Sequence, residues 1–179
     1  MCTEIEAKLK VESHKEIIKR LAELGAEFFQ EQLQTDYYFD DANKTLTKTD
    51  RCLRLRWLQI DREEKIFLTY KGAKEKDRFK KRQEIEIEIK DTDSIEKLFS
   101  ALAYKKVLVL EKRRRIWRLG RCEVALDELP LLGSFVEIEG PDEKKIADMQ
   151  KNLRLSHLPH ITDSYASLLT EKLRRQSLG

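Results

Sequence analysis

Apolar and polar residues alternate one by one at the start of the chain, which is the pattern of a half-buried β-strand. One face of this predicted strand carries the charged side chains Glu4, Glu6, Lys8 and Lys10. The opposite face carries the apolar side chains Ile5, Ala7, Leu9 and Val11. The first segment therefore predicts a strand with a row of both carboxylates and ammonium groups on one side.

The same charged row recurs in later segments of the chain. Further charged residues that alternate with apolar ones, or flank one, are Arg54, Arg56, Arg82, Glu84, Glu86, Glu137 and Glu139. Lys112 and Arg114 lie two residues apart in a later segment, on either side of Arg113. Asp127 lies at the end of one such segment, directly before a loop. An ordinary solvated sheet face explains any single row, but explains less well why both signs recur at matched spacing.

Helical periodicity separates these strands. The apolar spacing predicts helices that begin at Ser13, at Thr92 or Asp93, after Gly140-Pro141-Asp142, and near Asp163. Further strands are predicted over 28–40, 52–60, 65–71 and 134–139. Two more strands flank a tight turn at 119–121, and a lysine-rich loop at 72–81 precedes the strand that contains Arg82, Glu84 and Glu86. The expected architecture is α+β, with about eight strands and four helices.

The charged rows favour a cavity over bulk solvent. Like charges at positions i and i+2 repel one another unless ligands of opposite sign lie between them. The opposite rows are apolar, so four amphipathic helices can cover the outside of the sheet. We therefore expect a curved or closed antiparallel sheet with a charged lumen.

The residue types indicate the ligands of such a lumen. Carboxylate oxygens suit Mg²⁺ or Mn²⁺, whereas His14, His157 and His160 show no zinc-like spacing. Arginine binds phosphate oxygens in bidentate fashion, and lysine acts as a point charge. A site with both kinds of residue is suited to a metal-bound polyphosphate.

Composition excludes several other classes. The length of 179 residues predicts one domain over 1–179, and 36 Lys and Arg against 33 Asp and Glu leave a net charge of only +3, too balanced for a nucleic-acid coat. No apolar run reaches the roughly 20 residues of a membrane span. Three cysteines without CxxC spacing argue against a disulfide framework. We expect a cytoplasmic protein without nucleic-acid or membrane partners, and a homodimer stays open.

An ordered series of motifs extends over the whole chain. They are Glu4-Ile5-Glu6-Ala7-Lys8, Asp36-Tyr37-Tyr38-Phe39-Asp40, Leu53-Arg54-Leu55-Arg56, Thr69-Tyr70-Lys71-Gly72, Arg82-Gln83-Glu84-Ile85-Glu86, Lys112-Arg113-Arg114, Ala125-Leu126-Asp127, Gly133-Ser134-Phe135-Val136-Glu137-Ile138-Glu139 and Ser164-Tyr165. This series resembles the CYTH family, also called triphosphate tunnel metalloenzymes, which includes class IV adenylyl cyclases, thiamine triphosphatases and inorganic triphosphatases.

The resemblance implies a fold and a set of site residues. The fold would be an antiparallel eight-stranded tunnel, closed or nearly closed, flanked by helices. The metal ligands it implies are Glu4, Glu6, Asp127, Glu137 and Glu139. The triphosphate-binding residues it implies are Lys8, Arg54, Arg56, Lys71, Arg82, Lys112 and Arg114. The resemblance also implies further acidic groups from Glu84 and Glu86. The catalytic residues it implies are Glu4, Glu6, Lys8, Glu84 and Glu86.

The main functional hypothesis is metal-dependent hydrolysis of inorganic tripolyphosphate, thiamine triphosphate or a nucleoside triphosphate. One Mg²⁺ or Mn²⁺ would bridge phosphate oxygens, and a second would activate water. The second hypothesis is an adenylyl cyclase, although only Met1-Cys2-Thr3 precede the ExExK segment, where class IV cyclases carry a His-Phe pair. Trp57 should point away from the lumen, so it does not replace the aromatic residue of the animal thiamine triphosphatases. A polyphosphate- or nucleotide-binding module without turnover and an RNA-binding protein also stay open.

Overall fold

The computed structural model describes the backbone of residues 2–73 and 80–177 and the side chains of residues 5–73 and 82–177. Its strands are β1 (Cys2–Val11), β2 (Glu27–Asp40), β3 (Cys52–Ile60), β4 (Glu63–Lys71), β5 (Lys80–Glu88), β6 (Lys105–Leu119), β7 (Cys122–Leu129) and β8 (Gly133–Glu139). Its helices are α1 (Lys15–Glu23), α2 (Thr45–Lys48), α3 (Thr92–Ala101), α4 (Glu143–Asn152) and α5 (Tyr165–Gln176).

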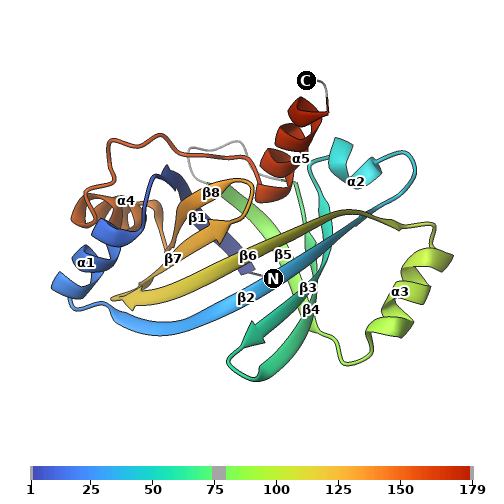
Figure 1. The fold of residues 1–179 in the computed structure, drawn as a ribbon, viewed down its shortest axis with the longest axis horizontal. Helices are drawn as coiled ribbons and strands as arrows, with labels where there is room; N and C mark the ends of the chain where they lie inside the picture. Colours follow the sequence, from blue (N-terminus) through green and yellow to red (C-terminus); the bar gives the residue numbers. More distant parts are fainter. Residues whose placement is uncertain (1, 74–79, 178–179) are drawn as a thin grey trace.

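The eight strands form a closed antiparallel barrel in the order β1-β5-β4-β3-β2-β6-β7-β8 (Figure 1). β5 completes the ring because its first half pairs with β1 and its second half with β4. The predicted turn at 119–121 joins β6 to β7, and Gly120 has a φ of 60° there, a conformation that glycine adopts without steric cost. The prediction of an α+β antiparallel barrel is confirmed.

The outer face of the barrel is apolar and is covered by helices on two sides. On one side, α1 and α4 pack through Leu21 and Ile146 against the outward residues of β1, β7 and β8. On another side, Phe99 of α3 packs against Phe39 of β2 in an edge-to-face contact of 4.8 Å between ring centroids. Trp57 belongs to this outer cluster, so its predicted orientation away from the lumen is confirmed.

Helix α5 lies at one end of the barrel, near α2 (Figure 1). Ser164 caps its N-terminus by accepting a hydrogen bond from the backbone N–H of Ser167 at 3.1 Å. Tyr165 and Leu169 then pack into a buried cluster with Leu110, Leu129 and Phe135 of the surrounding strands. The final helix is therefore anchored to the barrel by its first two turns.

Three local predictions need correction. About four helices were predicted, but the chain also forms the short helix α2 after Asn43, which gives five helices in the described part of the chain. Helix α1 was predicted to begin at Ser13, but its N-cap is His14 and its first residue is Lys15, whose N–H donates to the Ser13 hydroxyl at 3.2 Å. β5 already begins at Lys80, and residues 74–79 of the predicted lysine-rich loop lie outside the described residues.

Asp40 explains why a helix as short as α2 forms. Its buried carboxylate accepts hydrogen bonds from the backbone N–H groups of Asp41, Leu46 and Thr47 at 2.9 to 3.0 Å, and from the Thr47 hydroxyl at 2.6 Å. A four-residue helix cannot sustain itself by its own hydrogen bonds. The anchor for α2 is thus a carboxylate at the end of β2.

Replacing Asp40 with alanine should lower the free energy of unfolding by about 2 kcal/mol, because the backbone donors at the start of α2 lose their acceptor. Urea denaturation followed by circular dichroism measures this loss. Thr47→Val removes only the hydroxyl donor and should cost less than half as much. Equal losses for the two variants would contradict an anchoring role of the Asp40 carboxylate.

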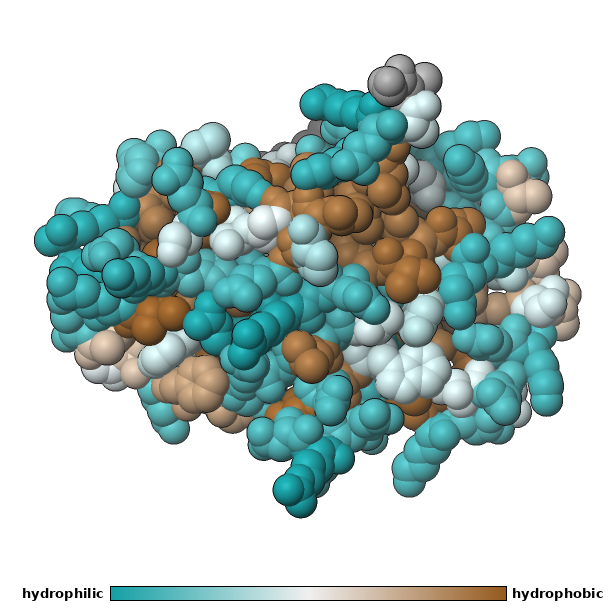
Figure 2. Space-filling model, in the orientation of Figure 1, coloured by the Kyte–Doolittle hydropathy of each residue, from teal (hydrophilic) through white to brown (hydrophobic). Residues whose placement is uncertain are grey.

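The surface near α5 is partly apolar. Figure 2 shows brown, hydrophobic surface gathered beside α5 and β6, and the exposed apolar side chains of these elements and of the β7–β8 turn are Val107, Val109, Leu131 and Leu173.

None of the helices in the described part of the chain has the length and apolar character required to span a membrane.

Candidate functional site

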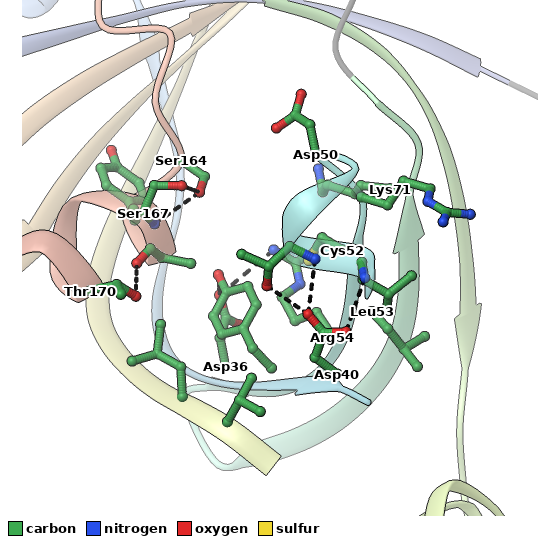
Figure 3. A pocket seen from close by; sticks show the side chains of 18 of the residues that line it. Asp36, Asp40, Asp50, Cys52, Leu53, Arg54, Lys71, Ser164, Ser167 and Thr170 are labelled. Carbon is green, nitrogen blue, oxygen red and sulfur yellow. Dashed lines mark hydrogen bonds and ion pairs between the residues drawn. The ribbon is translucent and has the colours of Figure 1, made fainter. Parts of the chain in front are cut away.

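A cavity of about 690 Å³ occupies the barrel and reaches α2 and α5, which supply part of its lining (Figure 3). All seven cations predicted to bind phosphate line it: Lys8, Arg54, Arg56, Lys71, Arg82, Lys112 and Arg114. They come from five different strands. They share the cavity because each occupies an inward position of a strand whose side chains alternate between the two faces.

One ion-pair network lies on the half of the barrel built by β2 to β5. Asp36 accepts two hydrogen bonds from Arg56, at 2.6 and 2.7 Å, and lies 3.6 Å from Arg54. Arg54 also donates to the Thr69 hydroxyl at 3.1 Å, which in turn donates to Glu86 at 2.8 Å. Thus one buried carboxylate orients two neighbouring guanidinium groups.

Lys71 and Glu84 extend this first network along β4 and β5. The Lys71 ammonium group donates to the Glu84 carboxylate, and the other oxygen of Glu84 lies 4.0 Å from Arg54. Charged pairs are therefore continuous from β2 to β5.

A second network lies on the half of the barrel built by β1, β6, β7 and β8. Arg114 donates two hydrogen bonds to Asp127, at 2.7 and 2.6 Å, and one to Glu137. Lys8 lies 3.3 Å from Glu137, and Lys112 lies 3.7 Å from Asp127. Asp127 and Glu137 therefore hold three of the cavity cations in place.

Tyr165 connects this second network to α5. Its hydroxyl donates a hydrogen bond to Asp127 at 2.8 Å, and the Lys8 ammonium group lies 4.2 Å from its ring centroid. The Lys112 ammonium group lies 5.1 Å from the same ring. Contacts of this kind are cation–π interactions. The first residue of α5 therefore positions two lysines as well as a carboxylate.

The charge states of both networks follow from burial and neighbouring charges. Burial raises the pKa of Asp36, but Arg56 and Arg54 outweigh this effect and hold the pKa well below its usual range. Burial likewise raises the pKa of Asp127, and Arg114 reverses the shift. Both carboxylates are consequently ionised at neutral pH.

The pKa values of Tyr165 and Lys112 in the second network are shifted toward the neutral form of each group. Burial and the nearby Glu137 raise the pKa of Tyr165, so its hydroxyl stays protonated. Burial, followed by the charge of Arg114, lowers the pKa of Lys112 to about 7. The charge of Lys112 is therefore sensitive to what else occupies the cavity.

Two cavity guanidinium groups retain unused hydrogen-bond donors. Arg54 is 7% exposed and Arg82 is 6% exposed, and the Nε atom of each is buried without a hydrogen-bond partner in the described part of the chain. A buried donor that lacks an acceptor is costly. These two donors favour an anion as the natural occupant.

The predicted acids are placed less uniformly than the cations. Glu6, Glu84, Glu86 and Glu137 line the cavity. The side chain of Glu4 lies outside the described residues, although its backbone pairs with Arg82. Asp127 is completely buried behind Arg114 and Tyr165, and Glu139 lies exposed on β8. Neither residue lines the cavity.

The donor types on the cavity wall fit Mg²⁺ or Mn²⁺. Among the side chains that the structure describes, no three histidine, cysteine or acidic residues converge closely enough to hold an ion. Mg²⁺ is commonly bound by one or two carboxylates together with the phosphates of a substrate, so a full protein cage is not required. Glu6 and Glu137 are the cavity carboxylates among the predicted metal ligands.

Asp36, Thr69 and Tyr165 were not among the predicted site residues. Asp36 and Thr69 orient the cations of the first network, and Tyr165 those of the second. The sequence did contain a signal for Asp36, because it shares one face of its strand with other polar residues such as Tyr38, two positions further along. The partners of all three come from other elements, and only the tertiary structure identifies them.

The fold and the cavity together define a class of protein: a closed antiparallel barrel that encloses buried cations and carboxylates. The model of the CYTH domain matches residues 3–165 of this chain. The chain belongs to the CYTH domain family.

Individual relatives agree with this assignment. The chain is 32% identical over 148 residues to the "Putative adenylate cyclase MJ0240" of Methanocaldococcus jannaschii, covering 83% of this chain and 80% of that protein. The structure of the PH1819 protein from Pyrococcus horikoshii superposes with a TM-score of 0.81 at 32% identity, over 94% of this chain and 99% of that one.

A plant protein shares the fold at lower identity. The Hippeastrum protein HpAC1, described as a "Putative adenylyl cyclase" with a dominant triphosphatase activity, superposes with a TM-score of 0.75 at 18% identity. The match covers 94% of this chain and 95% of the plant protein. At this identity the likeness concerns the fold.

Proposed function

We propose that this protein binds a triphosphate in the barrel cavity and hydrolyses it with the help of Mg²⁺ or Mn²⁺. The observation that carries the proposal is the convergence of seven cations from five strands on one cavity that also contains carboxylates. A triphosphate would add negative charge opposite these cations, and an arginine fork matches the geometry of its oxygens.

The protein's own residues would bind and orient the substrate. Arg54 and Arg82 each present a buried Nε donor to an anion, and Lys8 and Lys112 are held near Tyr165 on the other half of the barrel. Cations on both halves would fix the phosphate chain and stabilise the charge that develops in the transition state.

Glu6 and Glu137 are the proposed metal ligands among the carboxylates that line the cavity, and Glu4 and Glu139 remain proposed ligands from the sequence alone. A bound ion would neutralise phosphate charge and favour in-line attack on phosphorus. Asp127 is proposed instead to hold Arg114 and Lys112, since both of its oxygens accept hydrogen bonds inside the wall.

Hydrolysis is preferred over cyclisation as the leading proposal. The Hippeastrum protein, which shares the fold, is described as a dominant triphosphatase. The name of the Methanocaldococcus relative favours adenylyl cyclase activity as the second candidate. Both reactions would use the same cavity, but cyclisation directs the ribose 3′-hydroxyl rather than water at a phosphorus atom.

Incubation with Mg²⁺ or Mn²⁺ and tripolyphosphate, thiamine triphosphate or ATP should release orthophosphate from at least one substrate. Separation of orthophosphate, pyrophosphate and cyclic AMP by ion-exchange chromatography measures the outcome, and EDTA provides the control without metal. Formation of cyclic AMP with pyrophosphate would contradict the hydrolase and support the adenylyl cyclase. Tight binding of a substrate without any product would contradict both enzymes and support a polyphosphate- or nucleotide-binding module.

A further inference from the structure

The outer face of β2 and β6 is uncovered in its middle by the helices that the structure describes. The two strands pair along most of their length and run between α1 and α3 (Figure 1). Helices α1 and α4 pack on β1, β7 and β8, and α3 packs at the Phe39 end of β2. We call the outward row of both strands the β2–β6 face. It consists of Phe28, Glu31, Leu33, Thr35 and Tyr37 of β2 and Val109, Glu111, Arg113, Arg115 and Trp117 of β6.

Exposed apolar side chains lie at both ends of the β2–β6 face and in its middle. Phe28 is 48% exposed, Leu33 is 52% exposed and Val109 is 45% exposed. In the register of the two strands, Phe28 lies opposite Trp117 at one end, and Tyr37 lies opposite Val109 at the other. Burying such residues against another molecule is favourable, and aromatic residues are enriched in protein interfaces. The face therefore has the composition of a docking surface.

Opposite charges lie between the two apolar ends. Glu111 and Arg113 are successive residues of the outward row of β6, because Lys112 between them points into the cavity. Arg113 pairs with Glu31 at 2.6 Å, but this pair is exposed and contributes little to stability. Glu111 is exposed and has no ion-pair partner among the side chains that the structure describes. The Glu111 carboxylate is thus available to a cation of another molecule.

The order of these residues is complementary to itself. If two copies lay their β6 strands antiparallel about a two-fold axis near Lys112, Glu111 of each copy faces Arg113 of the other. Leu33 and Thr35, which are their neighbours on β2, then face each other as well. Reversal of the strand direction also brings the two different apolar ends of the face together. One symmetric arrangement therefore satisfies both the charges and the apolar residues.

We propose that the β2–β6 face is the interface of a homodimer with two-fold symmetry, in which Glu111 of each subunit pairs with Arg113 of the other. A second copy of the chain is the partner that the charge pattern selects, because unlike charges meet twice across the axis. Such reciprocal pairs fix the register of an interface and disfavour other partners. The inference is independent of the proposed function, since none of the charged residues of this face lines the cavity.

The test measures the oligomeric state by sedimentation velocity across a range of protein concentrations. The wild type should have twice the mass of one chain. Glu111→Arg and Arg113→Glu each bring like charges together across the axis, and each should raise the dissociation constant of the dimer at least tenfold. An equimolar mixture of the two variants should recover the dimer, because one variant is cationic at both positions and the other is anionic at both.

Lys144→Glu is the matched control, since it reverses an exposed charge on α4 outside the β2–β6 face and should leave the dissociation constant unchanged. Thermal unfolding followed by circular dichroism verifies that each variant is folded. A wild type that stays monomeric at every concentration would overturn the interface, and so would a dimer that neither reversal weakens. Two monomeric variants whose mixture also stays monomeric would overturn the pairing of Glu111 with Arg113.

Discussion

Replacing Glu6 with glutamine is expected to lower kcat/KM for triphosphate hydrolysis at least about 100-fold while the barrel stays folded. Glu6 is 6% exposed and lines the cavity on β1, two residues before Lys8. The substitution keeps the size and shape of the side chain but removes its charge. Glutamine is a much weaker ligand for Mg²⁺ or Mn²⁺ than a carboxylate, so the loss should fall on metal binding.

Two measurements separate this effect from unfolding. The Mn²⁺ concentration at half-maximal activity should rise, and calorimetric titration with Mn²⁺ in the presence of tripolyphosphate should show weaker binding. Thermal unfolding should stay within a few degrees of the wild type. Glu31→Gln is the matched control, because the Glu31 carboxylate pairs with Arg113 at 2.6 Å and does not line the cavity.

Glu31→Gln should retain wild-type activity, since exposed ion pairs contribute little to stability. Turnover by Glu6→Gln within threefold of the wild type, with an unchanged Mn²⁺ dependence, would remove Glu6 from the proposed metal site. If Glu6→Gln behaves in this way and Glu137→Gln loses most of its activity, the proposed metal ligand would be Glu137 on β8 rather than Glu6 on β1.

Strand periodicity and the family resemblance together were enough to predict which cations share the cavity. Lys8, Arg54 and Arg82 belong to different strands, yet alternation fixed each of them on the inward face before the order of the strands was known. A one-residue slip would have moved a whole row to the outside. In β1 and β3 the intervening apolar residues exclude that slip, because they pack under α1 and α4 and under α3, respectively.

Pairing between distant segments was not predictable in the same way. Asp36 lies opposite Arg56 in the β2–β3 register, and Asp127 is buried because α5, 38 residues further along the chain, places Tyr165 over it. Alternation assigns a face to each residue but does not tell which inward residues touch. The depth of Asp127 and the orienting role of Asp36 therefore emerge only from the closed barrel.

Helix α2 was not predicted because it, too, depends on a contact with another segment of the chain. Its four residues carry too little periodicity to indicate a helix, and its stability comes from Asp40 rather than from its own sequence. Sequence patterns thus located the charged residues of the cavity, whereas the part of the wall supplied by α2 depends on a tertiary anchor.

Replacing Asp36 with asparagine is expected to lower the free energy of unfolding by about 3 to 5 kcal/mol at neutral pH, because two largely buried guanidinium groups lose their carboxylate. The side chains of Asp36, Arg54 and Arg56 are 2%, 8% and 14% exposed. Triphosphate affinity should fall as well, since Arg54 and Arg56 lose the group that orients them. Urea denaturation measures the stability, and Asp93→Asn, an exposed substitution on α3, should cost less than about 0.5 kcal/mol.

The pH dependence of this loss has a definite sign. The folded-state pKa of Asp36 lies below its unfolded value of about 3.9, because Arg56 and Arg54 outweigh the effect of burial. The carboxylate therefore contributes its full stability above that unfolded value and loses it as the pH falls through the folded pKa. The difference between the wild type and Asp36→Asn should be constant from pH 7 to about pH 5 and shrink below about pH 4.

A double-mutant cycle with Arg56→Gln tests the origin of the effect. Once Asp36 is asparagine, removing the charge of Arg56 should cost much less than it does in the wild type, or even restore stability, because the uncompensated buried charge disappears. Additive losses in the cycle would mean that the two side chains do not interact in solution. The bidentate pair between β2 and β3, and with it the orientation of the cations on that half of the cavity, would then have to be abandoned.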